Sequence, residues 1–246
     1  FIIMCGAVLL TGCSKSKDTG NTPVPGDLSA REVKMNTAII GNRAACESDP
    51  SNLPLSATDV WFLRTADAPA GSVDWTSVGT SAQSPAGYSA GYFGATIGTD
   101  GSVVFTYASC TVEVKIYYSD NVSNYAHFMG LYPGSGATLT NSTGNTVATW
   151  IIDGKTDVMI SNYVNGNKSS ASPVTPQFKH LLTWLEFQVK AVDATASTIW
   201  GDVQSVTIEG ANSSVTVEFE GDNTQTNYAG TGNLTTVSAT DGTPAS

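Results

Sequence analysis

Short segments in which apolar and polar residues alternate recur along most of this chain, and no segment keeps a helical period. The clearest one covers residues 111–118, where valine, isoleucine and tyrosine occupy every second position. This spacing places the apolar side chains on one face of an extended strand. Similar segments return about every ten residues, with Gly, Asn, Asp and Pro between them. The pattern therefore predicts an all-β fold, and more specifically an antiparallel β-sandwich.

The composition agrees with this fold and limits the partners. Charged residues make up only 13% of the chain, whereas Gly, Ser, Thr and Asn are abundant. This usage is typical of a β-rich protein outside the cytoplasm. The formal net charge is -10 and the sequence contains no basic cluster. Because nucleic acids are bound through basic clusters that neutralise phosphates, we predict no nucleic-acid partner.

Particular segments give more specific predictions. Residues 60–63 are apolar at every position and predict a strand that is buried on both faces. Asp153-Gly154 lies between two apolar runs, which is a strong hairpin signal. From the alternation we expect the following side chains to face the core: Val112, Val114, Ile116, Leu185, Phe187, Val189, Val217 and Phe219.

The start of the chain has the features of an export signal. Residues 1–10 are apolar, and Leu10-Thr11-Gly12-Cys13 leads into a polar stretch rich in Gly and Pro. A spanning helix needs about 20 apolar residues, so this run is too short. The stretch resembles the lipobox of a bacterial lipoprotein signal peptide, in which the chain is cut before an acylated cysteine. We expect Cys13 to carry palmitate or similar acyl chains; an ordinary secretory signal with a chance cysteine is the alternative.

These features suggest a division of the chain. We expect residues 1–12 to be a signal peptide truncated at its start and residues 13–31 to be a tether. One β-sandwich domain is expected over residues 32–229, with its first strand at about residues 32–41. Residues 230–246 are rich in Thr, Ser and Gly. They are predicted to be a linker toward a second domain that this sequence lacks.

Few residues are suited to catalysis. The two histidines, His127 and His180, lie in apolar strand contexts and are predicted to be structural. Cys46 and Cys110 are compatible with one disulfide in an oxidising compartment. Equally, Cys110 is compatible with a buried strand position and Cys46 with a segment that is removed. No Cys/His spacing is typical of zinc, so we predict no metal. Because so few residues are suited to catalysis, we also predict no enzyme activity, no catalytic residue and no cofactor.

Five features, in this order along the chain, resemble the Bacteroidales fimbrillins, the FimA/Mfa-like lipoprotein subunits of surface fimbriae. They are the lipobox, the early strand ending at Asn42-Arg43-Ala44, the aromatic stretch ending at Leu131-Tyr132-Pro133, Asp157-Val158-Met159 after the predicted turn, and residues 178–187, which are similar to a strand motif of that family. The resemblance implies a transthyretin-like β-sandwich that forms the N-terminal domain of a two-domain fimbrillin.

The resemblance also implies a function and its sites. The chain would be a structural subunit, or a minor tip or anchor component, of a fimbria on the outer membrane, with other fimbrial subunits and a host protein or glycan as partners. In this family a protease cuts after an arginine and removes the first strand, and a neighbour's segment fills the groove. Arg43 matches that processing position. Arg31 is the second choice, because a cut there leaves the strand in place.

A non-polymerising surface lipoprotein is the alternative function. Such a protein would act as an adhesin or as a glycan-binding module. The chain has five tryptophans that are compatible with a glycan platform, although tryptophans at alternating strand positions more often belong to the core. They are Trp61, Trp75, Trp150, Trp184 and Trp200.

Overall fold

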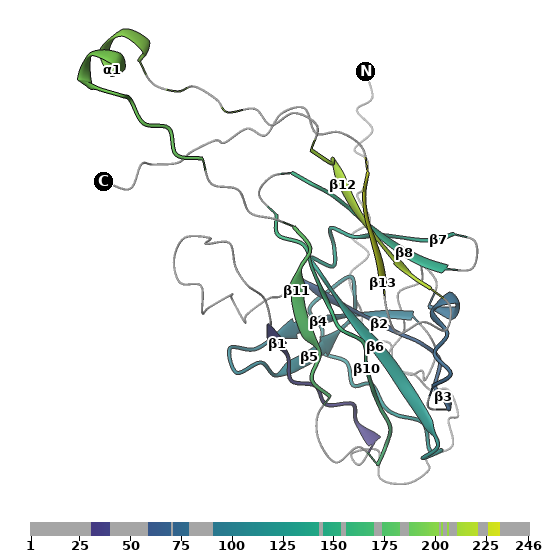
Figure 1. Cartoon of the computed structure of the whole chain (residues 1–246). Helices are drawn as coiled ribbons and strands as arrows, with labels where there is room; N and C mark the ends of the chain where they lie inside the picture. The colour runs from purple at the N-terminus through teal and green to yellow at the C-terminus, as the bar shows by residue number, and fades with distance from the viewer. Residues whose placement is uncertain are drawn as a thin grey trace, which may run out of the picture.

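The computed structural model describes residues 31–39, 59–69, 71–78, 91–142, 145–153, 156–169, 174–182, 187–201, 203, 206, 211–220 and 226–231. Strands dominate these residues (Figure 1). They are β1 (Ala38–Ile39), β2 (Val60–Arg64), β3 (Ala68–Pro69), β4 (Gly91–Ile97), β5 (Val103–Thr106), β6 (Asn124–Tyr132), β7 (Thr138–Ser142), β8 (Asn145–Ile151), β9 (Met159–Ser161), β10 (Val164–Gly166), β11 (Gln177–His180), β12 (Ser214–Phe219) and β13 (Thr226–Thr231). A 3₁₀ turn covers Trp75–Ser77, and one short helix, α1, covers Ala194–Trp200.

The strands form two sheets. The larger, nine-stranded sheet has the order β1-β11-β9-β6-β2-β4-β5, and β3 and β10 also pair with β6. The smaller sheet has the order β13-β12-β8-β7. Among the paired strands, β1 and β11 run parallel and the other pairs run antiparallel. The predicted all-β, antiparallel sandwich is therefore confirmed.

The central strands of the larger sheet bury both of their faces. In β2, Phe62 belongs to one hydrophobic cluster and its neighbour Leu63 to another. In β6, Phe128 and Met129 divide between the same two clusters. Because successive side chains of a strand point to opposite faces, a strand covered on both sides must be apolar at consecutive positions. This confirms the prediction for residues 60–63.

Two clusters make up the core. The first lies on one face of the larger sheet, where the ring of Phe62 packs edge-on against Phe105 and Phe178. A Cβ atom at Gly130 would overlap the ring of Phe178, so the absence of a side chain there allows this packing. The second cluster joins the two sheets through Trp150 and other buried residues. Each large apolar side chain buried in this way contributes about 1.5–3 kcal/mol.

The predicted hairpin at Asp153-Gly154 is wrong. The strand before it, β8, belongs to the smaller sheet, whereas the strand after it, β9, belongs to the larger one. The turn signal has a local explanation, because the Asp153 carboxylate accepts hydrogen bonds from the amide and the hydroxyl of Thr156, both at 2.7 Å. The direction of the chain is set instead by burial of Trp150 and Ile160 in the second cluster.

The predicted inward side chains are partly confirmed. Val114, Ile116, Val217 and Phe219 are buried, as expected. Val112 is half-buried, and Leu185 lies outside the described residues. The prediction is wrong for Phe187 and Val189, which are 54% and 64% exposed, because residues 187–191 belong to no strand and no element of the described chain covers them.

Candidate assembly site

The N-terminal segment (residues 31–39) lies between two stretches of backbone, which we call its first and second walls. The first wall consists of residues 101–103 and 116–118. The amides of Tyr118 and Val103 donate to the carbonyls of Arg31 and Met35 (2.8 and 3.1 Å), and the amides of Val33 and Thr37 donate to the carbonyls of Ile116 and Gly101 (2.9 and 2.7 Å). Odd-numbered residues of the segment therefore bond the first wall.

Even-numbered residues bond the second wall, which consists of Val174 and β11. The Asn36 amide donates to the Val174 carbonyl (3.1 Å), and the Val174 amide donates to the Lys34 carbonyl (3.2 Å). Further along, β1 pairs in parallel with β11. The segment therefore contacts both ends of the larger sheet. Its own strand β1 pairs with β11 at one end, and its earlier residues bond the first wall, where β5 begins at the other end. It has the bonding of an interior strand, with backbone partners on both sides.

Side chains of the segment alternate between the core and the surface. Val33, Met35 and Thr37 are buried, and the first two belong to the first cluster. Between them, Lys34 and Asn36 are exposed. This is the pattern of a strand with one face on the core, and it agrees with the predicted first strand at about residues 32–41, of which residues 40 and 41 lie outside the described part.

Two ion pairs link the start of the segment to residues 115 and 120, which lie just outside the first wall in the sequence. The Lys115 ammonium lies 3.1 Å from both Glu32 carboxylate oxygens. Arg31 Nη1 lies 2.5 Å from Asp120 Oδ1. Lys115 and Asp120 are exposed, so solvent screens both ion pairs, although the Arg31 side chain itself is buried. The backbone hydrogen bonds and the buried side chains therefore hold the segment more than its charges do.

Gly101 allows the segment to approach the first wall closely. Its φ of 82° lies in the left-handed region, and a Cβ atom there would lie 2.7 Å from the Thr37 carbonyl oxygen. At this position the Gly101 carbonyl accepts hydrogen bonds from the Thr37 amide and, at 3.2 Å, from its hydroxyl. A side chain at residue 101 would both strain the backbone and push the segment outward.

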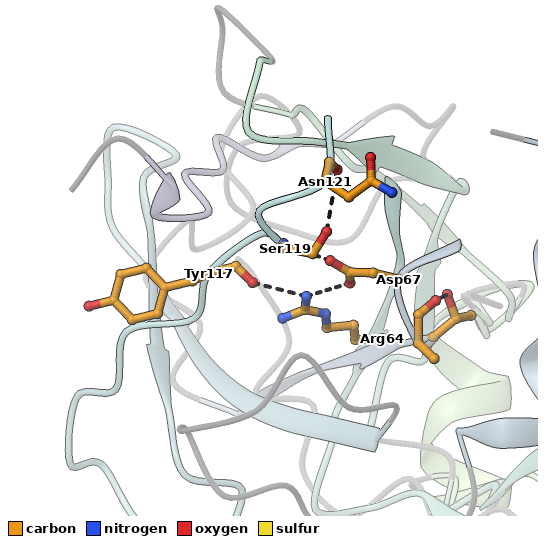
Figure 2. A network of polar contacts seen from close by, with 7 residues as sticks. Arg64, Asp67, Tyr117, Ser119 and Asn121 are labelled. Carbon is orange, nitrogen blue, oxygen red and sulfur yellow. Dashed lines mark hydrogen bonds and ion pairs between the residues drawn. The ribbon is translucent and has the colours of Figure 1, made fainter. Parts of the chain in front are cut away.

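A buried ion pair supports the first wall from within (Figure 2). Arg64 is fully buried, and its Nη2 donates to Asp67 Oδ1 at 2.6 Å and to the Tyr117 carbonyl at 3.0 Å. The other oxygen of Asp67 accepts from the Ser119 amide at 2.8 Å, and the guanidinium lies 5.7 Å from the centre of the Phe128 ring. The pair thus holds residues 117–119 on the side opposite to the N-terminal segment.

The sequence contains a signal for this pair that the strand pattern alone does not reveal. Arg64 lies two residues after Phe62 and so faces the same side of a strand that is apolar elsewhere. A charge at such a position is costly unless it is paired, and Asp67 follows three residues later. Nearby, burial raises the pKa of Tyr118 to about 12, so this phenol stays neutral in the wall.

Both histidines are bonded within the fold. His127 is buried, and its Nδ1 lies 2.6 Å from the Tyr163 hydroxyl. Asn165 donates to the same hydroxyl at 2.7 Å, so Tyr163 joins His127 and Asn165 in one hydrogen-bonded group. Burial lowers the pKa of His127. His180 lies 2.6 Å from the Asp157 carboxylate; burial raises the pKa of that carboxyl, against the effect of His180.

The predicted site residues are distributed as follows. Arg31 lies in the N-terminal segment, and it is buried. Cys13 and Arg43 lie outside the described residues. Cys110 is part of a disulfide. Its partner lies outside the described residues, as does Cys46.

Several other groups were candidates for binding. Trp75 and Trp150 are buried in the second cluster, and Trp61 is packed against Tyr92, so these three do not form an exposed platform for glycans. The described residues contain no group of three or more metal-ligating side chains. Within the same residues, no helix has the length and apolar character needed to cross a membrane.

The fold and the site define an antiparallel β-sandwich protein whose N-terminal segment has backbone hydrogen-bond partners on both sides. A family model described as fimbrillin-like matches residues 68–245. Because this match covers more than half of the sequence, the chain belongs to the fimbrillin-like family. The comparisons with curated proteins and with solved structures gave no match. Membership of this structural, non-enzymatic family supports a subunit-type role in a cell-surface fimbria, in association with other fimbrial subunits.

Proposed function

We propose that this chain is a fimbrial subunit that assembles by strand exchange after proteolysis. A protease cuts after Arg43, the N-terminal segment leaves the sheet, and an extended segment of a neighbouring copy takes its place. The observation that carries this proposal is the bonding of residues 31–39 on both sides. Removing an interior strand leaves two unpaired edges, and unpaired edges are readily completed by another chain.

The emptied groove would favour a new strand for two reasons. Without Val33 and Met35, the apolar side chains of Phe105, Val114 and Ile116 lose part of their cover. Their exposure costs about 25 cal/mol for each Å² of apolar surface. Each backbone N–H or C=O group left buried without a hydrogen bond costs about a further 1–3 kcal/mol. A strand with inward apolar side chains would remove both costs.

Cleavage is needed because the segment is otherwise held by its own chain. In the intact protein the segment is joined to β2 through residues 40–58, so it rebinds as an intramolecular partner at a high effective concentration. A cut after Arg43 converts it into a separate peptide. Once it dissociates it is diluted, and a neighbouring copy can compete for the groove.

The choice of Arg43 is supported by the other arginines. The sequence has three, Arg31, Arg43 and Arg64. Arg31 and Arg64 are buried and ion-paired, and the Arg31 carbonyl accepts a hydrogen bond from the first wall. Proteases need a backbone that can enter their active site. A cut after Arg31 would also leave residues 32–39 in place, so it would not open the groove.

We further propose that Cys13 anchors the uncut chain in the outer membrane through acyl chains. Buried acyl CH₂ groups contribute about 0.8 kcal/mol each, so two or three chains hold a protein firmly. A cut after Arg43 would separate the sandwich from this anchor, whereas an uncut copy would stay attached. Mass spectrometry of the membrane fraction should find the acylated Cys13 in uncut chains, and Cys13→Ala should abolish the modification.

The assembly proposal is tested with an arginine-specific protease, which spares the exposed Lys34 and Lys190. We expect limited digestion to give a chain that begins at Ala44, identified by N-terminal sequencing. That product should form ladders on unheated gels and filaments in the electron microscope. The control is Arg43→Ala, which should stay uncut and monomeric. A chain that begins at Ala44 and remains monomeric, or an Arg43→Ala variant that assembles normally, would contradict the proposal.

A further inference from the structure

The two parts of the first wall belong to one hairpin-like stretch, residues 101–118, which we call the wall hairpin. Its tip contains Cys110, whose amide donates to the Tyr107 carbonyl at 3.2 Å. Cys110 is half-buried, and its sulfur is part of a disulfide. Because every other cysteine precedes residue 47, the tip of the wall hairpin is tied covalently to a part of the chain that is distant in sequence.

The N-terminal segment holds the open end of this hairpin. It bonds residues 101–103 on one arm of the hairpin and residues 116–118 on the other. Between the open end and the tip, the Val114 amide donates across the hairpin to the Phe105 carbonyl at 2.8 Å. Removal of the segment would therefore withdraw the bonds at the open end, which is the place where an incoming strand has to bind.

The sequence offers three partners for Cys110, namely Cys5, Cys13 and Cys46. Cys5 lies in the apolar run that is predicted to be a signal peptide. Cys13 is the residue that we propose to be lipid-modified, and a sulfur that carries a lipid group cannot also form a disulfide. Cys46 is the cysteine that remains.

We propose that Cys46 is the partner of Cys110, and that this disulfide holds the wall hairpin in place when the N-terminal segment leaves. The identity of the pair stands on the bonded state of Cys110, whereas its role rests on the proposed function. The bond forms by thiol–disulfide exchange, in which the two thiols lose two protons and two electrons and a disulfide-carrying oxidoreductase is reduced to its dithiol. Such bonds persist in the oxidising compartments outside the cytoplasm.

The position of Cys46 relative to the proposed cut decides which fragment keeps the bond. A cut after Arg43 leaves two residues in front of Cys46, so the disulfide stays with the sandwich. The released peptide ends at Arg43, has no covalent bond to the wall hairpin and is free to dissociate. A bond from Cys13 to Cys110 would have the opposite effect, because it would keep the cut segment attached beside its groove.

The disulfide would also connect the wall hairpin to the centre of the larger sheet. Cys46 precedes β2 in the chain, β2 pairs with β4, and β4 pairs with β5 of the wall hairpin. A bond between Cys46 and Cys110 therefore closes a ring that contains three paired strands. Because a cross-link restricts the separation of the parts that it joins, it opposes local unfolding of the hairpin while the groove is empty.

The identity of the pair is tested by peptide mapping of uncut protein from the membrane fraction. Digestion with pepsin at acidic pH keeps thiols protonated and so prevents exchange. We expect a peptide with Cys46 joined to a peptide with Cys110, and reduction should separate the two in the mass spectrum. A free Cys46 thiol, or a Cys110 peptide joined to Cys5 or Cys13, would overturn the inference. This result does not depend on cleavage or on assembly.

The role of the bond is tested by hydrogen exchange at the Val114 amide, which reports on the two arms of the hairpin. In cut wild-type protein, diluted to prevent assembly, this amide should remain protected. In the cut double variant Cys46→Ser/Cys110→Ser it should exchange at least about tenfold faster. The uncut double variant is the control, because its N-terminal segment still bonds both arms, and its Val114 amide should remain protected. Equal exchange in the two cut proteins would contradict the role.

Assembly assays separate this inference from the proposed function. If the cut wild-type chain forms ladders and the cut double variant forms them to the same extent, the proposed function stands and the role of the disulfide is wrong. If no cut chain assembles, the wild type included, the proposed function fails and the role of the disulfide fails with it. The peptide map then still decides whether Cys46 is the partner of Cys110.

Discussion

Residues 33–37 and residues 187–191 both have apolar side chains separated by polar ones. Val33 and Met35 are buried between the two walls, whereas Phe187 and Val189 are exposed on the stretch that carries α1 (residues 187–201, the arm). Their local patterns are nearly interchangeable. The difference is that the N-terminal segment has backbone partners on both sides, supplied by residues far away in the sequence. Alternation therefore determines which side chains share a face, and distant partners determine whether that face is covered.

The largest difference between the two regions should appear in buried charge. Asp67→Ala leaves Arg64 buried without its carboxylate partner, and we expect a loss of about 3–5 kcal/mol in the free energy of unfolding. The matched change on the arm is Asp193→Ala, which removes an exposed carboxylate that accepts a hydrogen bond from the Ala196 amide. Its loss should be about 1 kcal/mol or less. Urea denaturation measures both, and equal losses would contradict the structural role of the buried pair.

Apolar truncation should separate the regions next. Met35→Ala removes a side chain that is 2% exposed, and the expected loss lies toward the lower end of about 2–5 kcal/mol, because a segment near the chain end can relax. Val189→Ala on the arm should change the stability by less than about 0.5 kcal/mol. Similar losses for both variants in urea denaturation would show that the arm is packed in solution.

Two glycines with positive φ give a finer comparison. Gly101 (φ 82°) faces the Thr37 carbonyl, whereas Gly201 (φ 69°) at the end of the arm has open space where a Cβ atom would be. Gly101→Ala should cost about 1–2 kcal/mol of backbone strain, plus the overlap with Thr37. Gly201→Ala should bear strain alone, confined to the arm, and should leave global thermal unfolding nearly unchanged. If Gly101→Ala unfolds at the wild-type temperature, the close contact with the segment is absent.

The smallest expected effect is the dependence of the free energy of unfolding on pH. It concerns the sheets and not the arm, because residues 187–201 contain no histidine. The pKa of His127 is lowered from 6.5 by burial. The unfolded chain therefore binds a proton at this residue before the folded chain does. Its contribution is complete above pH 6.5 and is lost as the pH falls through the lowered pKa. We expect wild-type stability to fall on acidification from pH 6.5 more than that of His127→Gln; parallel profiles in urea denaturation would contradict this assignment.

The alternation of apolar and polar residues predicted correctly which side chains of a strand are buried where this depends on the strand alone. It predicted the buried faces of Val114, Ile116, Val217 and Phe219, because alternation is a property of the strand itself. For Phe187 the same alternation gave a wrong prediction, since burial also requires a second element to cover the apolar face, and the local sequence does not show whether there is one. At Asp153 a side-chain hydrogen bond within the turn imitated a hairpin.

The candidate site was predicted only in part, for physical reasons of the same kind. The resemblance to fimbrillins is confirmed by the family match over residues 68–245, whereas the removal of an early strand that it implies stays a proposal. The two walls could not be predicted, because they combine residues 101–103, 116–118, 174 and β11, which are distant in sequence. The support of one wall by Arg64 and Asp67 depends on a buried charge, which a pattern of apolar residues does not register.

The most direct test of the account is amide hydrogen exchange before and after cleavage with the arginine-specific protease. The amides of Val103, Tyr118 and Val174 donate to the N-terminal segment, whereas the Val114 amide donates to Phe105 within the sheet. We predict that the first three lose protection when the segment leaves and regain it on assembly, while Val114 stays protected throughout. If the three amides remain protected in cleaved, monomeric protein, either the segment has stayed in the groove or the groove is closed without a strand from another copy. Either result would contradict the account.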